Sequence, residues 1–126
     1  MIVSESKNAN YCTEISNETS IVFSDVTEEK GGQGQYFRPH DLLCAGLSAC
    51  LNIGARMLMD HHNIKYDKVI VKVDLDRTDA NKTKFQYNID IVGELSKETK
   101  RWVIEKASNC AVRKTLSKEL TFKLIP

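Results

Sequence analysis

The chain has 126 residues, 41% hydrophobic and 28% charged, and its 18 basic and 17 acidic side chains leave a formal net charge of +1. This length and composition suit one folded domain, which we expect over residues 1–126. The balanced charge, without a basic stripe carrying aromatic residues, argues against a nucleic-acid partner. The first ten residues lack the basic start and apolar run of a signal peptide, so a cytoplasmic location is expected.

Three short apolar stretches near the N-terminus predict two or three antiparallel strands. They are Ile2–Val3, Tyr11–Ile15 and Ser20–Phe23, and segments rich in asparagine and serine separate them. The polar segment Glu28–Phe37 follows with three glycines, which indicates a loop.

A long helix is predicted to begin at Pro39 and to end near His61–Asn63. Proline fits a first helical turn, and Asp41 complements the positive helix end. Apolar or small residues then recur at helical spacing and are expected to face the core: Leu43, Leu47, Cys50, Gly54, Met57 and Leu58. Because this apolar stretch also carries Arg56, we interpret it as a buried core helix and expect no membrane partner.

Alternating apolar and polar residues over 69–76 and 83–92, joined by the turn segment 78–82, predict a long hairpin. Ser96 is expected to cap a second helix that begins at Lys97, carries Val103, Ala107 and Cys110 on one face and ends near Arg113. The segment 119–125 is expected to be a final strand. This order of elements predicts an α+β fold with antiparallel sheet.

Four cysteines stand at positions 12, 44, 50 and 110. Without a secretion signal a stable disulfide framework is not expected, and the histidines and cysteines form no zinc pattern, so no metal or other cofactor is predicted. Cys12 and Cys44 are interpreted as packing residues. Cys50 and Cys110 share a predicted core, where they either pack inertly or approach within the ~7 Å between Cα atoms that a disulfide requires.

A thiol that attacks a substrate must be ionised, and an ordinary thiol with a pKa of about 8.5 is mostly neutral at pH 7. Candidate cations near the two cysteines are Arg38 and His40 at the helix start, Arg56, and Arg113 just past Cys110. Arg56 follows Cys50 by six positions, a rotation of about 600°, so it is expected to point away from the Cys50 face. There it either faces a partner chain or forms a structural ion pair with a carboxylate.

Two sequence blocks resemble the OsmC/Ohr family, which covers osmotically inducible protein C and organic hydroperoxide resistance protein. The blocks are PHDLLCAGLSAC, ending at Cys50, and NCAVRKTL, which contains Cys110. The segment GELSKETKRWVIEKA is similar to the family's run into its second helix, and the resemblance covers about residues 30–126. It implies an OsmC-like fold: antiparallel sheets wrapped around two long central helices in an intertwined homodimer.

The resemblance also implies thiol-dependent reduction of small organic hydroperoxides in oxidative-stress defence. Cys50 would be the peroxidatic residue and Cys110 the resolving residue, and a cellular dithiol would reduce their disulfide. Peroxidases of the family stabilise the thiolate with an N-terminal arginine held by a glutamate directly after the helix-opening proline. Residues 1–37 here contain no arginine and His40 follows the proline, so Arg38 is the expected substitute, oriented by His40 or Asp41.

Two other functions remain open on sequence grounds. The first is a module on the same scaffold that binds an apolar small molecule or senses redox state without turnover, which the arginine-free N-terminus favours. The second is a structural dimer in which both cysteines are inert core residues. The separation of the two sulfur atoms and the presence of a cavity beside Cys50 discriminate between these readings.

Overall fold

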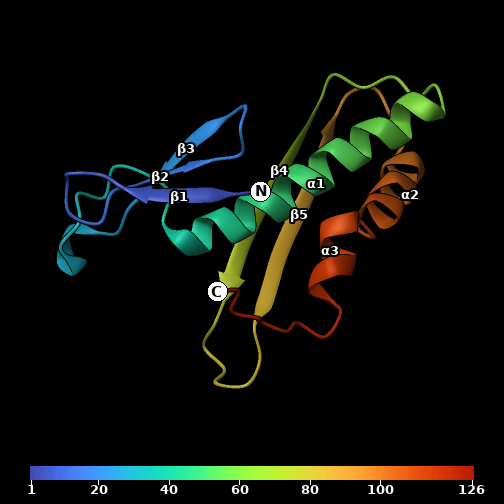
Figure 1. Ribbon diagram of the computed structural model, residues 1–126. Helices are drawn as coiled ribbons and strands as arrows, with labels where there is room; N and C mark the ends of the chain where they lie inside the picture. The colour runs from blue at the N-terminus through green and yellow to red at the C-terminus, as the bar shows by residue number, and fades with distance from the viewer. The chain divides into compact units, whose positions relative to one another are not determined.

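The computed structural model describes residues 1–126, and the chain divides into two compact units, Met1–Leu43 and Cys44–Pro126 (Figure 1). The expectation of one domain over the whole chain stays a prediction.

The first unit contains a three-stranded antiparallel sheet in the order β1-β2-β3. Its strands are β1 (Val3–Ser6), β2 (Thr13–Ser16) and β3 (Ile21–Ser24), which confirms the short strands expected near the N-terminus. The Asn17 side chain organises the β2–β3 turn, because its Oδ1 accepts a hydrogen bond from the Ser20 N–H at 2.8 Å. A single turn of 3-10 helix, η1 (Glu28–Lys30), lies in the predicted loop.

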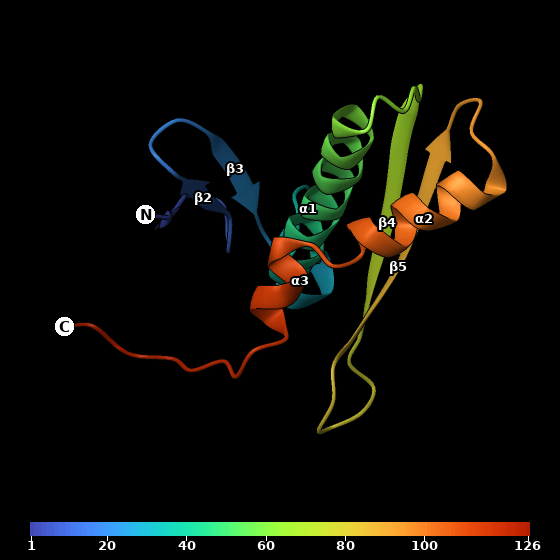
Figure 2. The same cartoon turned by 90° about the vertical axis from the view of Figure 1, so that its right-hand side faces the viewer.

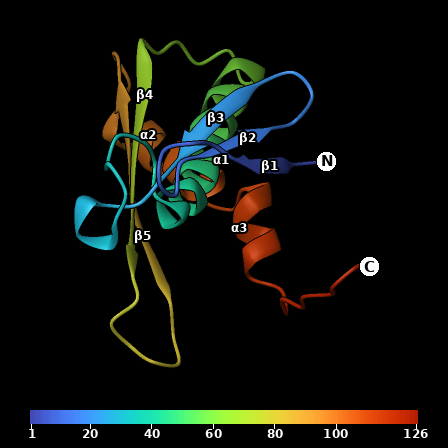
Figure 3. The same ribbon diagram turned by 60° about the vertical axis from the view of Figure 1, so that its left-hand side comes forward.

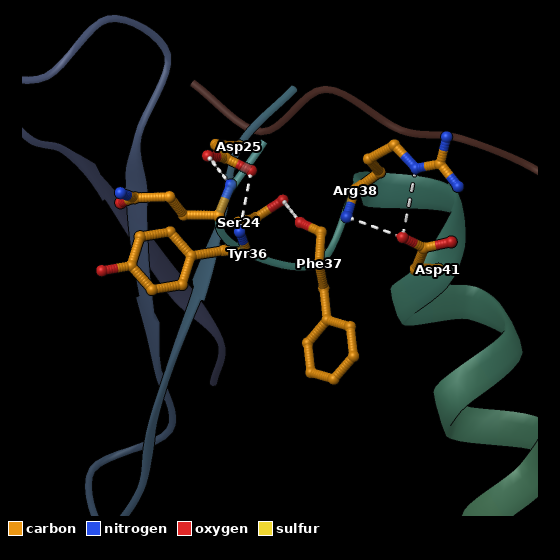
Figure 4. A network of polar contacts seen from close by, with 7 residues as sticks. Ser24, Asp25, Tyr36, Phe37, Arg38 and Asp41 are labelled. Atoms are coloured by element: carbon orange, nitrogen blue, oxygen red, sulfur yellow. Dashed lines mark hydrogen bonds and ion pairs between the residues drawn. The ribbon is translucent and has the colours of Figure 1, made fainter. Parts of the chain in front are cut away.

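The end of that loop is tied back to β3 by two buried polar residues (Figure 4). Asp25 is 3% exposed, and its carboxylate accepts hydrogen bonds from the backbone N–H groups of Gln35 at 3.0 Å and Tyr36 at 3.1 Å. The Ser24 hydroxyl donates to the Phe37 carbonyl at 2.7 Å. These bonds satisfy the buried carboxylate and hydroxyl, which would otherwise be costly to desolvate.

The second unit is built on the long helix α1 (Pro39–His61), whose first residues belong to the first unit, and on a hairpin of β4 (Lys68–Asp76) and β5 (Lys84–Val92). All three elements match their predicted positions. Asn63 has φ of 56°, so it ends α1 in the left-handed conformation expected of it. Figure 2 shows α1 and α3 (Ala111–Leu116) beside the hairpin and α2 (Lys97–Ala107) crossing in front of it.

The core lies between α1, the hairpin and the second helix. Its buried members are Leu47, Leu51, Ala55, Met59, Val69, Ile89, Ile91, Val103, Ala107 and Cys110. The predicted core stripe of α1 is therefore partly wrong, since Leu43 is 48% exposed and Met57 is 65% exposed. The helix is apolar on more than one face. The face that packs against the hairpin contains the residues at every fourth position from Leu47 to Met59.

The predicted second helix is two helices. Ser96 caps α2 (Lys97–Ala107) as expected, with its hydroxyl oxygen accepting from the Thr99 N–H at 3.1 Å. The chain then leaves the helix through Ser108 and Asn109, and α3 (Ala111–Leu116) begins after Cys110. Cys110 is thus the N-cap of α3 and not a member of a continuous helical face. Serine and asparagine favour caps and turns, which explains the break.

The expected strand at 119–125 is also wrong for this chain, because the segment after α3 is extended but pairs with no strand (Figure 3). Its apolar side chains are exposed, with Phe122 at 95% and Leu124 at 93%. Apolar and polar residues do alternate in this segment, but a strand also needs a neighbouring strand to receive its hydrogen bonds.

By length and composition alone, α1 is the one helix that could cross a membrane. Four of its residues, spaced four apart from Leu47 to Met59, form the core against the hairpin. We therefore describe α1 as the core helix of a folded domain, in agreement with the expectation from sequence.

Candidate active site

The sulfur atoms of Cys50 and Cys110, sixty residues apart in sequence, meet over the first turn of α3. The backbone N–H of Val112 donates to Cys50 Sγ at 3.5 Å, and the backbone N–H of Arg113 donates to Cys110 Sγ at 3.4 Å. The Cys50 thiol is close enough to Cys110 to contribute to the raised pKa of the Cys110 thiol. Two consecutive backbone N–H groups therefore donate to two neighbouring sulfur atoms. Both thiols lie where a bond between them could form.

The two cysteines differ in burial. Cys110 is 8% exposed, and this burial is the main cause that raises the pKa of its thiol above the ordinary value. The N–H of Arg113 opposes the rise, whereas the neighbouring Cys50 thiol adds to it. Cys110 consequently holds its proton at pH 7. Cys50 is only partly buried and lies nearer to the solvent.

An apolar groove of about 410 Å³ opens beside the thiol pair. Residues of α1 form one wall and the α2–α3 junction forms the other: Cys50, Ile53, Gly54, Met57 and Leu58, then Lys106, Ala107, Asn109, Cys110 and Ala111. Lys106 and Asn109 are the polar members of this lining, and the sequence reading did not identify either of them. The groove can admit an apolar group to within contact of Cys50.

Arg38 and Asp41 form a local pair at the start of α1 (Figure 4). The Asp41 carboxylate accepts from the Arg38 backbone N–H at 2.9 Å and from its Nε at 3.3 Å. The first of these bonds is the main cause that holds the pKa of Asp41 below its ordinary value. Asp41 therefore accepts the N–H just before the first turn of α1, in keeping with the role at the positive helix end expected of it.

The thiolate-stabilising role expected of Arg38, His40 and Asp41 remains a prediction, because these residues belong to the first unit and Cys50 to the second. Arg56 forms no ion pair and is exposed; its Nε donates to Asn52 Oδ1 at 2.9 Å. Asn52 in turn donates from Nδ2 to the Val69 carbonyl at 2.9 Å, which links α1 to β4. Arg56 is absent from the groove that Cys50 lines.

The remaining cation, Arg113, reaches neither sulfur with its guanidinium. Its Nη1 donates to Tyr87 Oη at 3.1 Å and to the Ser108 carbonyl at 3.1 Å. Only its backbone N–H contacts Cys110. The sequence reading placed Arg113 correctly beside Cys110 but missed its partners Tyr87 and Ser108, since nothing local in the sequence connects β5 to this junction.

Solved structures of similar fold define the class as an α+β domain with the OsmC-like fold. An OsmC-like protein from Mycoplasma pneumoniae superposes with a TM-score of 0.75 at 19% identity, covering 92% of this chain and 85% of that chain. An organic hydroperoxide resistance protein OsmC from Legionella pneumophila gives 0.64 at 20%, covering 93% and 88%. OhrB of Bacillus subtilis, an organic hydroperoxide resistance protein, gives 0.65 at 15%, covering 93% and 89%.

A family model described as OsmC-like protein matches residues 32–125. The chain therefore belongs to the OsmC family, as its two cysteine-containing blocks indicated. A comparison with curated proteins gives no significant match.

Proposed function

We propose that this protein is a cytoplasmic two-cysteine peroxidase that reduces small organic hydroperoxides and so contributes to oxidative-stress defence. The observation that carries the proposal is the meeting of Cys50 and Cys110 over the first turn of α3. The names of the Legionella and Bacillus structures, both organic hydroperoxide resistance proteins, support the substrate class.

In the first step the Cys50 thiolate attacks one oxygen of the peroxide, the O–O bond breaks, and the other oxygen leaves as an alcohol after taking a proton. Cys50 becomes a sulfenic acid and the peroxide is reduced by two electrons. The Val112 N–H donates to Cys50 Sγ and so orients the attacking sulfur. The apolar groove holds the alkyl part of the peroxide beside it.

In the second step the Cys110 sulfur attacks the Cys50 sulfenic acid, the S–S bond forms, and the S–O bond breaks to release water. The Cys110 proton leaves with that water. Its raised pKa keeps Cys110 protonated until this step, so the two sulfurs do not compete for the peroxide. An external dithiol then reduces the disulfide by exchange and is itself oxidised.

Two exposed apolar features support a homodimer as the working form. Ile53 at 48% and Met57 at 65% exposure lie on the face of α1 that borders the groove, and the tail at 119–125 exposes Phe122 and Leu124. An extended apolar segment without a partner strand is suited to pairing with a second copy. A second copy over the groove would also shelter a sulfenic acid from water.

The decisive experiment is steady-state consumption of cumene hydroperoxide by the reduced full-length protein, with dithiothreitol as reductant. The parent and Cys12→Ser, a cysteine outside the pair, are expected to consume peroxide equally. Cys50→Ser is expected to lose the activity. If Cys50→Ser consumes peroxide as fast as the parent, the assignment is wrong.

A second candidate function is a module that binds an apolar ligand or senses redox state without turnover. The groove of about 410 Å³ and the absence of arginine from residues 1–37 favour it. In that case the parent oxidises once with peroxide, but excess dithiothreitol and peroxide produce no sustained consumption. The two functions are separated by comparing the rate constant of the first oxidation with the rate constant of repeated cycles. Repeated cycles are expected only for the peroxidase.

A further inference from the structure

Arg113 makes contacts to three different parts of the second unit. Its Nη1 donates to the phenol oxygen of Tyr87 on β5 and to the carbonyl of Ser108 at the end of α2, each at 3.1 Å. Its backbone N–H donates to Cys110 Sγ at 3.4 Å. One residue therefore connects the hairpin, the α2 terminus and the sulfur of the buried cysteine.

Tyr87 is well placed to anchor this connection. It lies opposite Val73 in the hairpin, in register with the pairs Val71–Ile89 and Val69–Ile91 that supply the core face of the sheet. Tyr87 itself is 36% exposed, so its ring stands at the border of the core and its hydroxyl is available to a polar partner. The hairpin is the most extensively paired element of the unit, which makes it a rigid support.

The Ser108 carbonyl is one of the last carbonyls of α2, which lack partners within the helix. The Arg113 guanidinium, a planar group with several N–H donors, supplies that partner while it also reaches Tyr87. Ser108 and Asn109 form the two-residue link that delivers Cys110 to Cys50. Without this bridge the link would be held only by its flanking helices.

We propose that Arg113 and Tyr87 form a clamp that positions Cys110 for disulfide closure with Cys50. Disulfide geometry is strict in distance and dihedral angle, so closure depends on how well the Cys110 sulfur is held beside its partner. The clamp raises the effective concentration of one thiol at the other, as pre-organisation does in general. Arg113 and Tyr87 act through Cys110 and touch no substrate. The inference deepens the proposed function by assigning positioning residues to its second step.

The test is the thiol–disulfide equilibrium of the full-length protein in buffers of reduced and oxidised dithiothreitol, without peroxide. The disulfide forms as oxidised dithiothreitol is reduced to its dithiol, so the electrons balance within the assay. The fraction of Cys50–Cys110 disulfide is read by quenching with acid, alkylating free thiols and mapping peptides by mass. The same four proteins are compared throughout: the parent, Tyr87→Phe, Arg113→Lys and Lys114→Ala.

Tyr87→Phe keeps the aromatic ring and removes the hydroxyl. Arg113→Lys keeps the positive charge and removes the planar guanidinium group with its several N–H donors. Each is expected to lower the equilibrium constant for disulfide formation by about three- to tenfold, the range of one hydrogen bond. Lys114→Ala removes a neighbouring cation whose side chain is outside the clamp, and it is expected to match the parent. Thermal unfolding of each reduced protein measures its folding stability. A variant that only destabilises the fold unfolds at a lower temperature but keeps the parent's equilibrium constant for disulfide formation.

The clamp is overturned if Tyr87→Phe and Arg113→Lys close the disulfide with the equilibrium constant of the parent, or if the parent forms no such disulfide. Unchanged equilibrium constants in the two variants are distinct from failure of the proposed function, whereas a parent without the disulfide contradicts both. A parent that closes the disulfide readily but does not consume cumene hydroperoxide contradicts the peroxidase and leaves the clamp supported. A parent that consumes peroxide with an unchanged Tyr87→Phe equilibrium contradicts the clamp alone.

Discussion

The backbone N–H of Val112 donates a hydrogen bond to the sulfur of Cys50 from sixty-two residues further along the chain. This bond joins the start of α3 to the middle of α1, and the next N–H, that of Arg113, donates to Cys110. The first turn of α3 thus determines the surroundings of both thiols.

Replacing Val112 by proline removes the N–H that Cys50 accepts, at a helical position where proline is tolerated. At pH 7 the Cys50 thiol of Val112→Pro is expected to react with iodoacetamide about three- to tenfold more slowly than in the parent, because the thiolate loses a donor. Peptide mapping by mass gives the rate at Cys50. The matched control is Ala111→Pro, which places proline one residue earlier, where no N–H contacts a sulfur; equal rates in the two variants would contradict the role of this bond.

The raised pKa of Cys110 makes folding stability depend on alkaline pH. In the unfolded chain a thiol ionises near its ordinary pKa of about 8.5, whereas in the folded protein Cys110 holds its proton to higher pH. The stabilisation is fully present below the unfolded pKa and is lost as pH rises through the folded one. Urea unfolding of the reduced protein between pH 7 and pH 10 should show a steeper decline in the parent than in Cys110→Ala. Parallel declines in these two proteins would refute the shift, and Cys12→Ala serves as the control.

The lowered pKa of Asp41 predicts the opposite dependence at acidic pH. Its stabilisation of α1 is present above the unfolded pKa of about 3.9 and is lost as pH falls through the lower folded value. Asp41→Asn is expected to reduce the free energy of unfolding by about 0.5 kcal/mol at pH 7, a small effect because the pair is exposed to solvent. Urea titrations should show this difference shrinking toward pH 3, and a difference that persists there would contradict the assignment.

Dimerisation through the uncovered face of α1 predicts that a charge on that face produces monomers. Met57→Lys places an ammonium on a residue that is 65% exposed in the isolated chain and would be buried between two copies. Sedimentation velocity should show a dimer for the parent and a monomer for Met57→Lys. Gln86→Lys, on the exposed outer face of β5, is the control and should remain dimeric. A monomeric parent would refute the dimer.

The periodicity of the sequence was sufficient to place α1, the hairpin and the start of α2, because each has a strong pattern and a local end signal. Pro39 opens α1, Asn63 ends it in the left-handed conformation, and Ser96 caps α2. The same reasoning failed where two patterns competed. The predicted core stripe includes Met57, which is exposed, whereas the buried face is the adjacent one that ends in Met59.

The junction between α2 and α3 was missed although Ser108 and Asn109 stand in the sequence as turn-forming residues. The apolar spacing from Val103 to Cys110 fitted one helix, and that spacing outweighed the break signal. The contact of Arg113 with Tyr87 has no signal in a single sequence at all. It depends on how a hairpin register meets a helix terminus, which only the folded chain determines.

The most direct test of the central claim is the intact mass and peptide map of the reduced protein after one equivalent of cumene hydroperoxide. We expect the loss of two thiol hydrogens and a single crosslinked peptide pair joining Cys50 to Cys110, with Cys12 and Cys44 still reduced. A protein that keeps all four thiols, or that gains oxygen on Cys50 without ever forming the crosslink, would contradict the account.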